Sequence, residues 1–521
     1  MLFYPYLESL FFENFFIYFV FSLNFKLQPA TLKVGTYQSS DEHNGGGTMN
    51  IKKLLVFVLT LSTTTHYAQP TVSFQPHETW ITVFVHGIMS IKPHLKASNV
   101  LKFMCDDVCN TLYSKTVELM RLDRHFFKNQ AMQGFGFIKI DPKLVERGYS
   151  PGAIADLLND ITLWSEPEKT FDNHYYTYGW TGLLSPSQRF EDAKGLFLGL
   201  EKLVKEFKAQ GHNPKIRVIG YSHGGNVVLN LGAVHQRVRP TSNLRIDEAI
   251  LLGMPVQKET AKYVNDPVFK KVYHIFSGGD RVQKLDFFSF KRFFSCNKFT
   301  TCKKCELPKK LVQIELKLTR PTQKTRQNPD RLALSGDLSR PEIVSGHSHL
   351  LRDSSPGHAE LWFFAWPYVH YRETFALHPL PTVILLPYII KNVHMIEDIT
   401  DPRKPIIVDI RPEHGIVVLR RFKGKEVITS DFIPPHIFDA MREKAYLYKP
   451  NGYTIEEYDR HITLAIEKSK EIYRTEWCKN PINVRQRKKQ CHACCRRVSS
   501  TKDRLKEKCL MQQTETQESI K

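Results

Sequence analysis

The chain has 521 residues, more than one compact core of ordinary size holds, so we expect one large domain with appendages, or two domains. Hydrophobic residues make up 42% and charged residues 24% of the chain, which excludes a mainly disordered chain and a polytopic membrane protein. The formal net charge of +20 favours anionic partners such as nucleic acid, acidic lipid headgroups or polyphosphates, and carries no information about the fold.

A signal-peptide pattern begins at an internal methionine, Met49. Residues 49–68 carry Lys52 and Lys53 before the apolar segment 54–61, and then turn polar. This apolar segment is shorter than the roughly 20 residues that a helix needs to cross a bilayer. The pattern therefore predicts a cleaved signal peptide over residues 49–68.

The glycines just before this methionine bear on where translation starts. All glycine codons begin with GG, so residues 45–47 can conceal a purine-rich ribosome-binding sequence. We therefore expect residues 1–48 to be an over-extended start of a bacterial gene, or disordered. If translation starts at Met49, the protein is exported, to the periplasm or beyond the cell. The alternative is that apolar residues within 1–48 associate with a membrane.

The ten cysteines leave the redox state open. Export allows disulfides, whereas the two CxxC units with a nearby histidine also resemble halves of a zinc site. The two units lie far apart in the chain, so we expect disulfides or free thiols and no metal. Cys105 and Cys109 fall in a helical pattern, which favours small buried thiols. The other cysteines are Cys296, Cys302, Cys305, Cys478, Cys491, Cys494, Cys495 and Cys509, with His492 among them.

Strand-like and helix-like segments alternate through the middle of the chain. Apolar, β-branched runs indicate buried strands, and apolar residues at helical spacing indicate a helix over 188–210 and another from Gly224. Such strands, separated by helices, predict a doubly wound, mostly parallel α/β sheet covered on both faces. The expected strands are 80–87, 173–180, 216–222, 246–255, 272–280 and 311–318.

A GxSxG motif, "GYSHG" at residues 220–224, stands where a predicted strand meets a predicted helix. This is the context that a nucleophile elbow requires: the serine sits in a strained turn, and glycines remove side chains that would collide with strand and helix. The start of a helix also favours an anion at that point. The alternative is a glycine-rich turn in which Ser222 only caps the helix.

A second motif leads to a resemblance. "FVHGIMS", with His86 and Gly87, follows an early strand, and "GYSHGG", with Ser222, follows a later one. In this order the chain resembles the α/β-hydrolase superfamily, of the lipase and esterase-like kind, over about residues 79–366. The resemblance implies Ser222 as the nucleophile and the backbone N–H groups of Ile88 and His223 as the oxyanion hole. His86 is then expected to orient its loop.

The same resemblance implies that an acid and then a histidine follow the serine. Asp280, after the strand-like "HIFSGG", is the preferred acid. Asp286 is the reserve, Asp247 lies at the wrong end of its strand, and a plain turn aspartate is the alternative for Asp280.

For the histidine, His358 is preferred because it stands on a predicted loop before an apolar helix-like stretch, with His347 and His349 as alternatives. The separation of Asp280 and His358 exceeds a strand and a loop, so an insertion is expected between them.

These residues predict acyl transfer to water through an acyl-enzyme, without cofactor or metal. The substrate class is a carboxylic ester. Apolar or lipid esters are favoured by the aromatic segments 287–290 and 360–371, which equally fit the core. An acyltransferase with the same triad and a non-catalytic interaction protein of the same fold are the alternatives.

The C-terminal part changes character. Residues 367–477 predict a small appended α+β module, with a hairpin over 405–422 and helices over about 434–448 and 454–477. The tail, 478–521, holds twelve Lys or Arg against four Asp or Glu, and is expected to be disordered. Its charge fits an anionic membrane surface. No aromatic platform accompanies it, so nucleic acid is not the expected partner.

Overall fold

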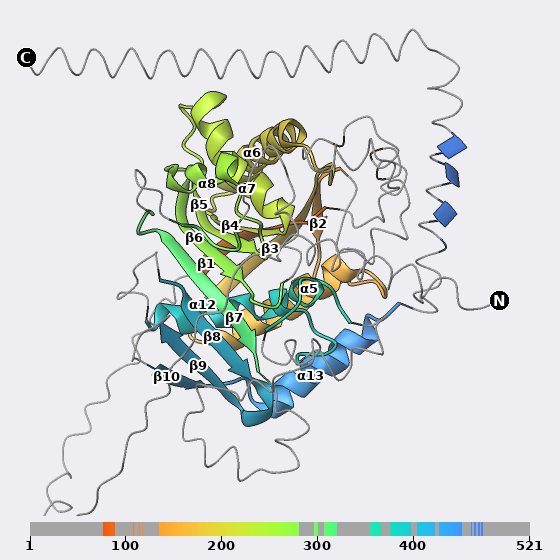
Figure 1. Ribbon diagram of the computed structural model, residues 1–521, viewed down its shortest axis with the longest axis vertical. Coiled ribbons are helices and arrows are strands. Elements are labelled where there is room, and N and C mark those ends of the chain that lie inside the picture. Colours follow the sequence, from red (N-terminus) through yellow and green to blue (C-terminus); the bar gives the residue numbers. More distant parts are fainter. Residues whose placement is uncertain are drawn as a thin grey trace, which may run out of the picture. The chain divides into compact units, whose positions relative to one another are not determined.

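In the computed structural model, ten strands among the described residues form one sheet with helices on both faces (Figure 1). The structure describes residues 77–88, 135–280, 296–300, 307–319, 355–365, 376–396, 404–421 and 427–450, with single positions between 108 and 117 and between 460 and 471. The order across the sheet is β10-β9-β8-β7-β6-β5-β4-β1-β3-β2. The strands are β1 (His77–Val85), β2 (Gly136–Ile140), β3 (Thr170–Gly179), β4 (Lys215–Tyr221), β5 (Ile246–Leu252), β6 (Phe269–Phe276), β7 (Leu311–Leu318), β8 (Ile406–Arg411), β9 (Ile416–Arg421) and β10 (Val427–Asp431).

The sheet is parallel from β3 to β8, and β2, β9 and β10 are antiparallel to their neighbours. The mostly parallel α/β class predicted from the apolar runs is therefore confirmed. The expected strand at 311–318 has the bounds that the sequence indicated. β1 lies between β3 on one side and β4 on the other, so the chain reverses its direction of advance at the β1/β4 pair. In open parallel sheets such a switch point opens a crevice at the carboxyl ends of the two strands.

Two helices cover one face of the sheet. α6 (Pro186–Ala209) and α7 (His223–Arg237) pack their apolar residues, among them Phe197 and Leu200, against β1, β4 and β5. The side chain of Ser185 caps α6 by accepting a hydrogen bond from the Gln188 N–H, and Pro186 stands at its first turn, where proline is tolerated. The predicted helix at 188–210 is thus present; it begins two residues earlier and ends one residue earlier than predicted.

The other face is covered by α5 (Ser150–Ser165), α12 (Leu386–His394) and α13 (Pro435–Leu447). In Figure 1 these three lie on the opposite side of the sheet from α6 and α7. α13 contributes Phe438, Met441 and Ala445 to the apolar core on this side, and the Lys444 ammonium bonds to Asp160 of α5 at 2.6 Å.

The C-terminal strands continue this sheet. β8 pairs with β7 in parallel, and β9 and β10 follow as antiparallel neighbours, so the predicted hairpin at 405–422 is present as β8 and β9. The boundary expected between residues 366 and 367 does not divide the sheet. The reason is the burial of β8: all six of its residues are buried, the ion pair of Asp409 and Arg411 included, which requires a neighbouring strand and cover on both faces. The second predicted helix, 454–477, lies mostly outside the described residues.

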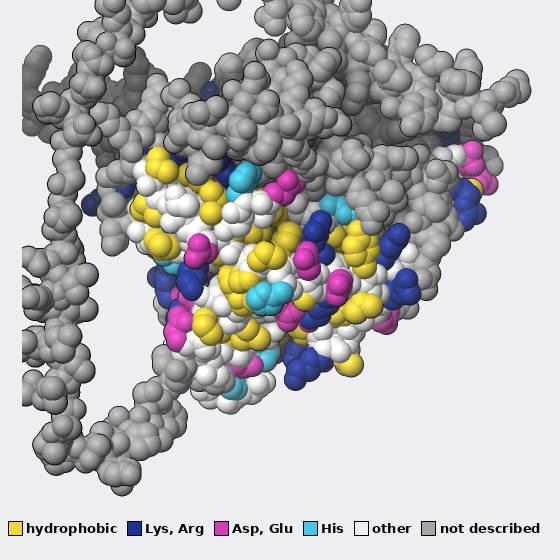
Figure 2. Space-filling view, turned by 90° about the horizontal axis from the view of Figure 1, so that it is seen from below, with side chains coloured by type: hydrophobic (Ala, Val, Ile, Leu, Met, Phe, Trp, Pro, Cys, Tyr) yellow, Lys and Arg dark blue, Asp and Glu magenta, His cyan; other side chains and the backbone are white. Residues whose placement is uncertain are grey.

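The face that looks down in Figure 1 carries charges of both signs. Figure 2 shows Lys and Arg side chains interspersed with Asp, Glu and hydrophobic side chains over its described part. The charge of the chain is therefore not gathered into one basic surface on the part of this face that is described. The basic tail over 478–521 lies outside the described residues, as do residues 1–76. None of the described helices is long and apolar enough to cross a membrane.

Candidate active site

Ser222 stands in a strained turn between β4 and α7. Its φ of 52° and ψ of −131° make it the sole non-glycine residue with positive φ within the described residues. Its N–H donates to Leu252 O at 2.9 Å, and its own C=O accepts from the Gly225 N–H at 2.9 Å. Such strain costs on the order of 1–3 kcal/mol and persists only when the surroundings enforce it. The predicted strand, turn and helix are all present, with Ser222 at their junction.

Glycines let three backbone segments meet at this turn. A Cβ on Gly224 would lie 2.3 Å from the His86 carbonyl oxygen, and one on Gly220 would lie 2.8 Å from Gly225 Cα. A Cβ on Gly87 would lie 3.0 Å from the Cβ of Ser222. The loop after β1 therefore packs directly on the start of α7, at the carboxyl ends of the two strands that form the switch point.

His86 is held on both sides of its ring. Nδ1 lies 2.7 Å from Gly87 O, and Nε2 lies 3.3 Å from the Trp180 N–H. A carbonyl only accepts and an N–H only donates, so Nδ1 carries the proton and Nε2 is the acceptor. The Trp180 indole also donates to His86 O at 2.6 Å and stacks on the ring. These contacts hold the ring and the carbonyl of His86 in place; that His86 orients its loop for a reaction stays a prediction.

Ile88 and His223 stand on the two sides of this junction. Ile88 is half-buried and ends the described part of the β1 loop, and His223 is the buried first residue of α7. The first N–H groups of a helix have no intrahelical acceptor, and the helix dipole makes this end positive. An oxyanion next to Ser222 would meet that positive end.

Asp280 and His358 are brought together from sequence positions 78 residues apart, with His358 Nδ1 at 2.6 Å from Asp280 Oδ2. The Asp280 side chain is fully buried, and that of His358 is 15% exposed. The two loops also join through Ser277, whose hydroxyl donates to Pro356 O at 2.7 Å. A Cβ on Gly279 would lie 2.3 Å from Ser355 O, so only glycine allows this approach.

Ser222 lies near this pair without bonding to it. Within the described part of the chain, no hydrogen bond joins Ser222 Oγ to His358, and the contact runs instead through Tyr221, whose hydroxyl donates to His358 O at 2.9 Å. Ser222 is buried, at 2% exposure.

The remaining predicted site residues are placed as follows. Asp247 lies at the start of β5, where it accepts from the Ile216 N–H at 2.8 Å and pairs with Lys270 at 2.6 Å, far from the turn. Asp286, His347 and His349 lie outside the described residues. The aromatic residues of 360–371 that are described pack in or against the core, Trp362 at 1% exposure; an acyl-binding role for this segment stays a prediction. The segment 287–290 is not among the described residues.

Cys296 is half-buried and free, and the other nine cysteines lie outside the described residues. No group of three His, Cys, Asp or Glu side chains that could hold a metal ion occurs within the ranges that are described.

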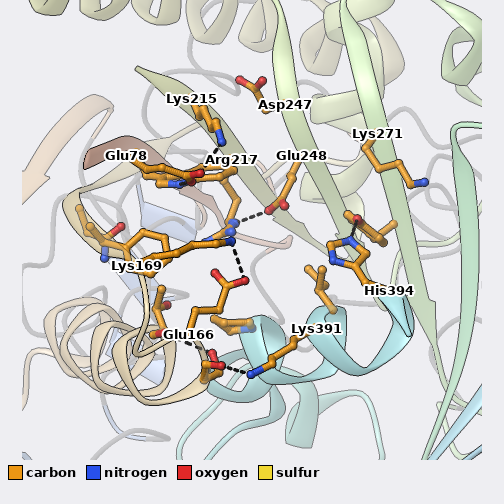
Figure 3. Close-up of a pocket in the computed structure, with 18 residues that line it drawn as sticks. Glu78, Glu166, Lys169, Lys215, Arg217, Asp247, Glu248, Lys271, Lys391 and His394 are labelled. Atoms are coloured by element: carbon orange, nitrogen blue, oxygen red, sulfur yellow. Dashed lines mark hydrogen bonds and ion pairs between the residues drawn. The ribbon is translucent and has the colours of Figure 1, made fainter. Parts of the chain in front are cut away.

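A polar cavity of about 390 Å³ lies at the other end of the strands (Figure 3). Its lining includes the early residues of β1, β4 and β5, and its charges are largely paired: Arg217 Nε donates to Glu248 at 2.6 Å, and Lys215 pairs with Glu78 at 2.9 Å. Burial opposes the charge of Arg217, but Glu248 more than offsets it and holds the pKa of Arg217 above its usual value. The cavity is separate from the Ser222 site, which lies at the carboxyl ends of the same strands.

Comparisons with known proteins name no relative for this arrangement: no protein-family model matches the chain, and a search of curated proteins finds no match.

Proposed function

We propose that the chain is a serine hydrolase of α/β-hydrolase type that cleaves carboxylic esters through an acyl-enzyme on Ser222. The observation that carries this proposal is the convergence of three groups at the carboxyl ends of β4, β5 and β6: the strained serine and the bonded pair of Asp280 and His358. The switch point between β1 and β4 is also where open parallel sheets bind ligands.

The chemistry follows from the roles of the three side chains. Ser222 Oγ attacks the ester carbonyl carbon, and His358 Nε2 takes the hydroxyl proton. Nδ1–H, bonded to Asp280, keeps the imidazole in the tautomer that leaves Nε2 free to accept. The proton then passes from Nε2 to the departing alcohol. A water activated by the same imidazole releases the acid and restores Ser222.

The negative charge of the tetrahedral intermediate falls at the start of α7. There the N–H groups of His223 and of Ile88 are the donors that we assign to it, helped by the positive end of the helix. Removing one such donor typically costs about 100- to 1000-fold in kcat. In the resting structure the Ser222 hydroxyl and the imidazole are not bonded. Such bonds are often long in unliganded enzymes and tighten when substrate is bound.

Ester hydrolysis tests the proposal. The full chain and a Ser222→Ala variant are assayed with p-nitrophenyl esters of increasing acyl length, with Ser242→Ala as a matched control, because Ser242 bonds to Glu201 on the surface of α6. We expect hydrolysis by the wild type and the control, and loss of more than about 1000-fold in Ser222→Ala. Equal rates in all three proteins would contradict the proposal, and a folded but inactive wild type would favour a non-catalytic role. The acyl-length profile identifies the ester class.

A second assay separates hydrolysis from acyl transfer. Adding an alcohol acceptor would yield mostly a new ester if the enzyme is a transferase. We expect the free acid to dominate.

A further inference from the structure

Tyr221 links the nucleophile strand to the histidine loop. It is the last residue of β4 and 3% exposed, and its hydroxyl donates to His358 O at 2.9 Å across 137 positions of sequence. Burial, together with the charge of Asp280, raises the pKa of Tyr221 well above its usual value, so the phenol stays neutral and keeps its donor proton. The contact joins the residue next to Ser222 directly to the backbone of the proposed base.

The ring of Tyr221 also faces the imidazole. The two ring centroids lie 4.8 Å apart with 31° between their planes. The phenol ring also stacks on Trp362, with the ring centroids 5.0 Å apart and 8° between the planes, and forms a T-shaped pair with Phe363 at 5.8 Å. These two aromatic contacts hold the ring in place, with its centroid 4.8 Å from that of the imidazole, which is within the range of a ring–cation interaction.

The position of the Tyr221 ring next to the imidazole matters for the charge that His358 gains during the proposed reaction. The face of an aromatic ring is electron-rich and attracts a cation within about 6 Å of its centre. In the proposed mechanism the imidazole of His358 acts as a base, so it is neutral when the reaction begins. It becomes a cation only when it has taken the serine proton. An interaction that appears only with that charge lowers the barrier without tightening substrate binding.

We propose that Tyr221 is the positioning residue of this site: its hydroxyl holds the loop that carries His358, and its ring stabilises the imidazolium that forms as Ser222 is acylated. The second half of this inference rests on the proposed serine hydrolase function. Among the described residues, the titratable groups next to His358 are Asp280 and Tyr221, and Glu360 lies close by because its carboxylate accepts a hydrogen bond from the Gly357 N–H.

The hydroxyl is tested with Tyr221→Phe. The matched control is Tyr273→Phe, because Tyr273 is also a buried phenol on the same sheet face but bonds to His394 at the far end of the strands, at 2.7 Å. We expect kcat to fall about 5- to 10-fold in Tyr221→Phe, the worth of one hydrogen bond, with KM nearly unchanged. Amide hydrogen exchange of the peptide covering residues 355–365 should become faster in this variant and stay unchanged in Tyr273→Phe.

The ring is tested without changing its shape. Starting from the Tyr221→Phe variant, the introduced phenylalanine is replaced by its mono-, di- and trifluoro analogues. Each added fluorine withdraws electron density from the ring face. We expect kcat to fall stepwise by about 10-fold in total, and the acid limb of the kcat/KM profile to move to lower pH as the imidazolium loses support. KM should not follow this series, because the ring acts on the charge that forms during reaction.

The outcomes separate this inference from the proposed function. Unchanged loop exchange and unchanged kcat in Tyr221→Phe would overturn the role of the hydroxyl. A kcat that does not vary across the fluorinated series would overturn the role of the ring. If Ser222→Ala is as active as the wild type, the proposed function fails and the ring role with it, while the exchange experiment still decides whether Tyr221 holds the loop.

Discussion

Gly224→Ala is expected to disrupt the junction where the β1 loop meets α7. The added methyl carbon would lie 2.3 Å from the His86 carbonyl oxygen and 2.5 Å from that of Val85. Ordinary contact begins near 3.4 Å, so the His86 carbonyl must move by about 1 Å. Both atoms are backbone, and the indole of Trp180 and the Nδ1 contact of His86 hold the loop in place, so no flexible side chain can give way.

The shift moves the loop that carries Ile88, the proposed oxyanion donor after β1, relative to Ser222. A displacement of about 1 Å at a reacting centre costs about 100-fold in rate, and overpacking costs about 1–3 kcal/mol of unfolding free energy. We therefore expect kcat for a p-nitrophenyl ester to fall about 100-fold in Gly224→Ala. Urea unfolding measures the stability loss separately.

Gly278→Ala is the matched control. The nearest atom to its added methyl would be Ser355 Oγ at 3.6 Å, which is ordinary contact. Stability and kcat should therefore stay near the wild-type values. If Gly224→Ala also keeps wild-type kcat and stability, the loop after β1 does not pack on α7 as described, and the argument for an oxyanion hole there is refuted.

Three further outcomes are predicted for titratable side chains. Asp280→Asn should lower kcat by about 10⁴-fold with little change in KM, because the amide favours the wrong imidazole tautomer. Glu248→Gln leaves the Arg217 guanidinium, whose side chain is 12% exposed, without its carboxylate; urea unfolding should show a loss of about 3 kcal/mol, while kcat stays within a few-fold of the wild type. Burial lowers the pKa of His274 from 6.5 to about 4. As the pH falls, His274 is therefore protonated in the unfolded chain before it is protonated in the folded protein. The free energy of unfolding should hold above pH 6.5 and fall by about 3 kcal/mol toward pH 4, a dependence that His274→Asn should flatten and that urea titrations at stepped pH measure.

The parts of the fold that sequence predicts well are those governed by local physics. Buried parallel strands read as apolar runs, and the strand-turn-helix junction at Ser222 is marked by glycines that the close backbone contacts require. α5 and β2 were not predicted. Most residues of α5 from Ser150 to Thr162 are buried, so the helix shows little of the apolar and polar alternation that indicates an amphipathic helix.

Contacts between segments that are far apart in the sequence cannot be predicted from local sequence patterns. The pairing of β8 with β7 depends on 87 intervening residues that no spacing rule describes, and the sequence therefore indicated a separate module. Among the three candidate histidines, the predicted loop and the family resemblance favour His358, whereas its distance from Asp280 in sequence gives no local pattern that links the two residues. The sequence indicates the role of Tyr221 only by an aromatic residue next to the serine. The hydrogen-bond partner of Tyr221, the carbonyl of His358, lies 137 positions away.

The most direct measurement is covalent labelling of the native protein with a fluorophosphonate, followed by peptide mapping. If Ser222 is an activated nucleophile, the label will be found on the peptide that contains Ser222, will be absent from Ser222→Ala, and will form far more slowly in Asp280→Asn. A folded protein that stays unlabelled, or one labelled on another serine at the same rate in both variants, would contradict the account.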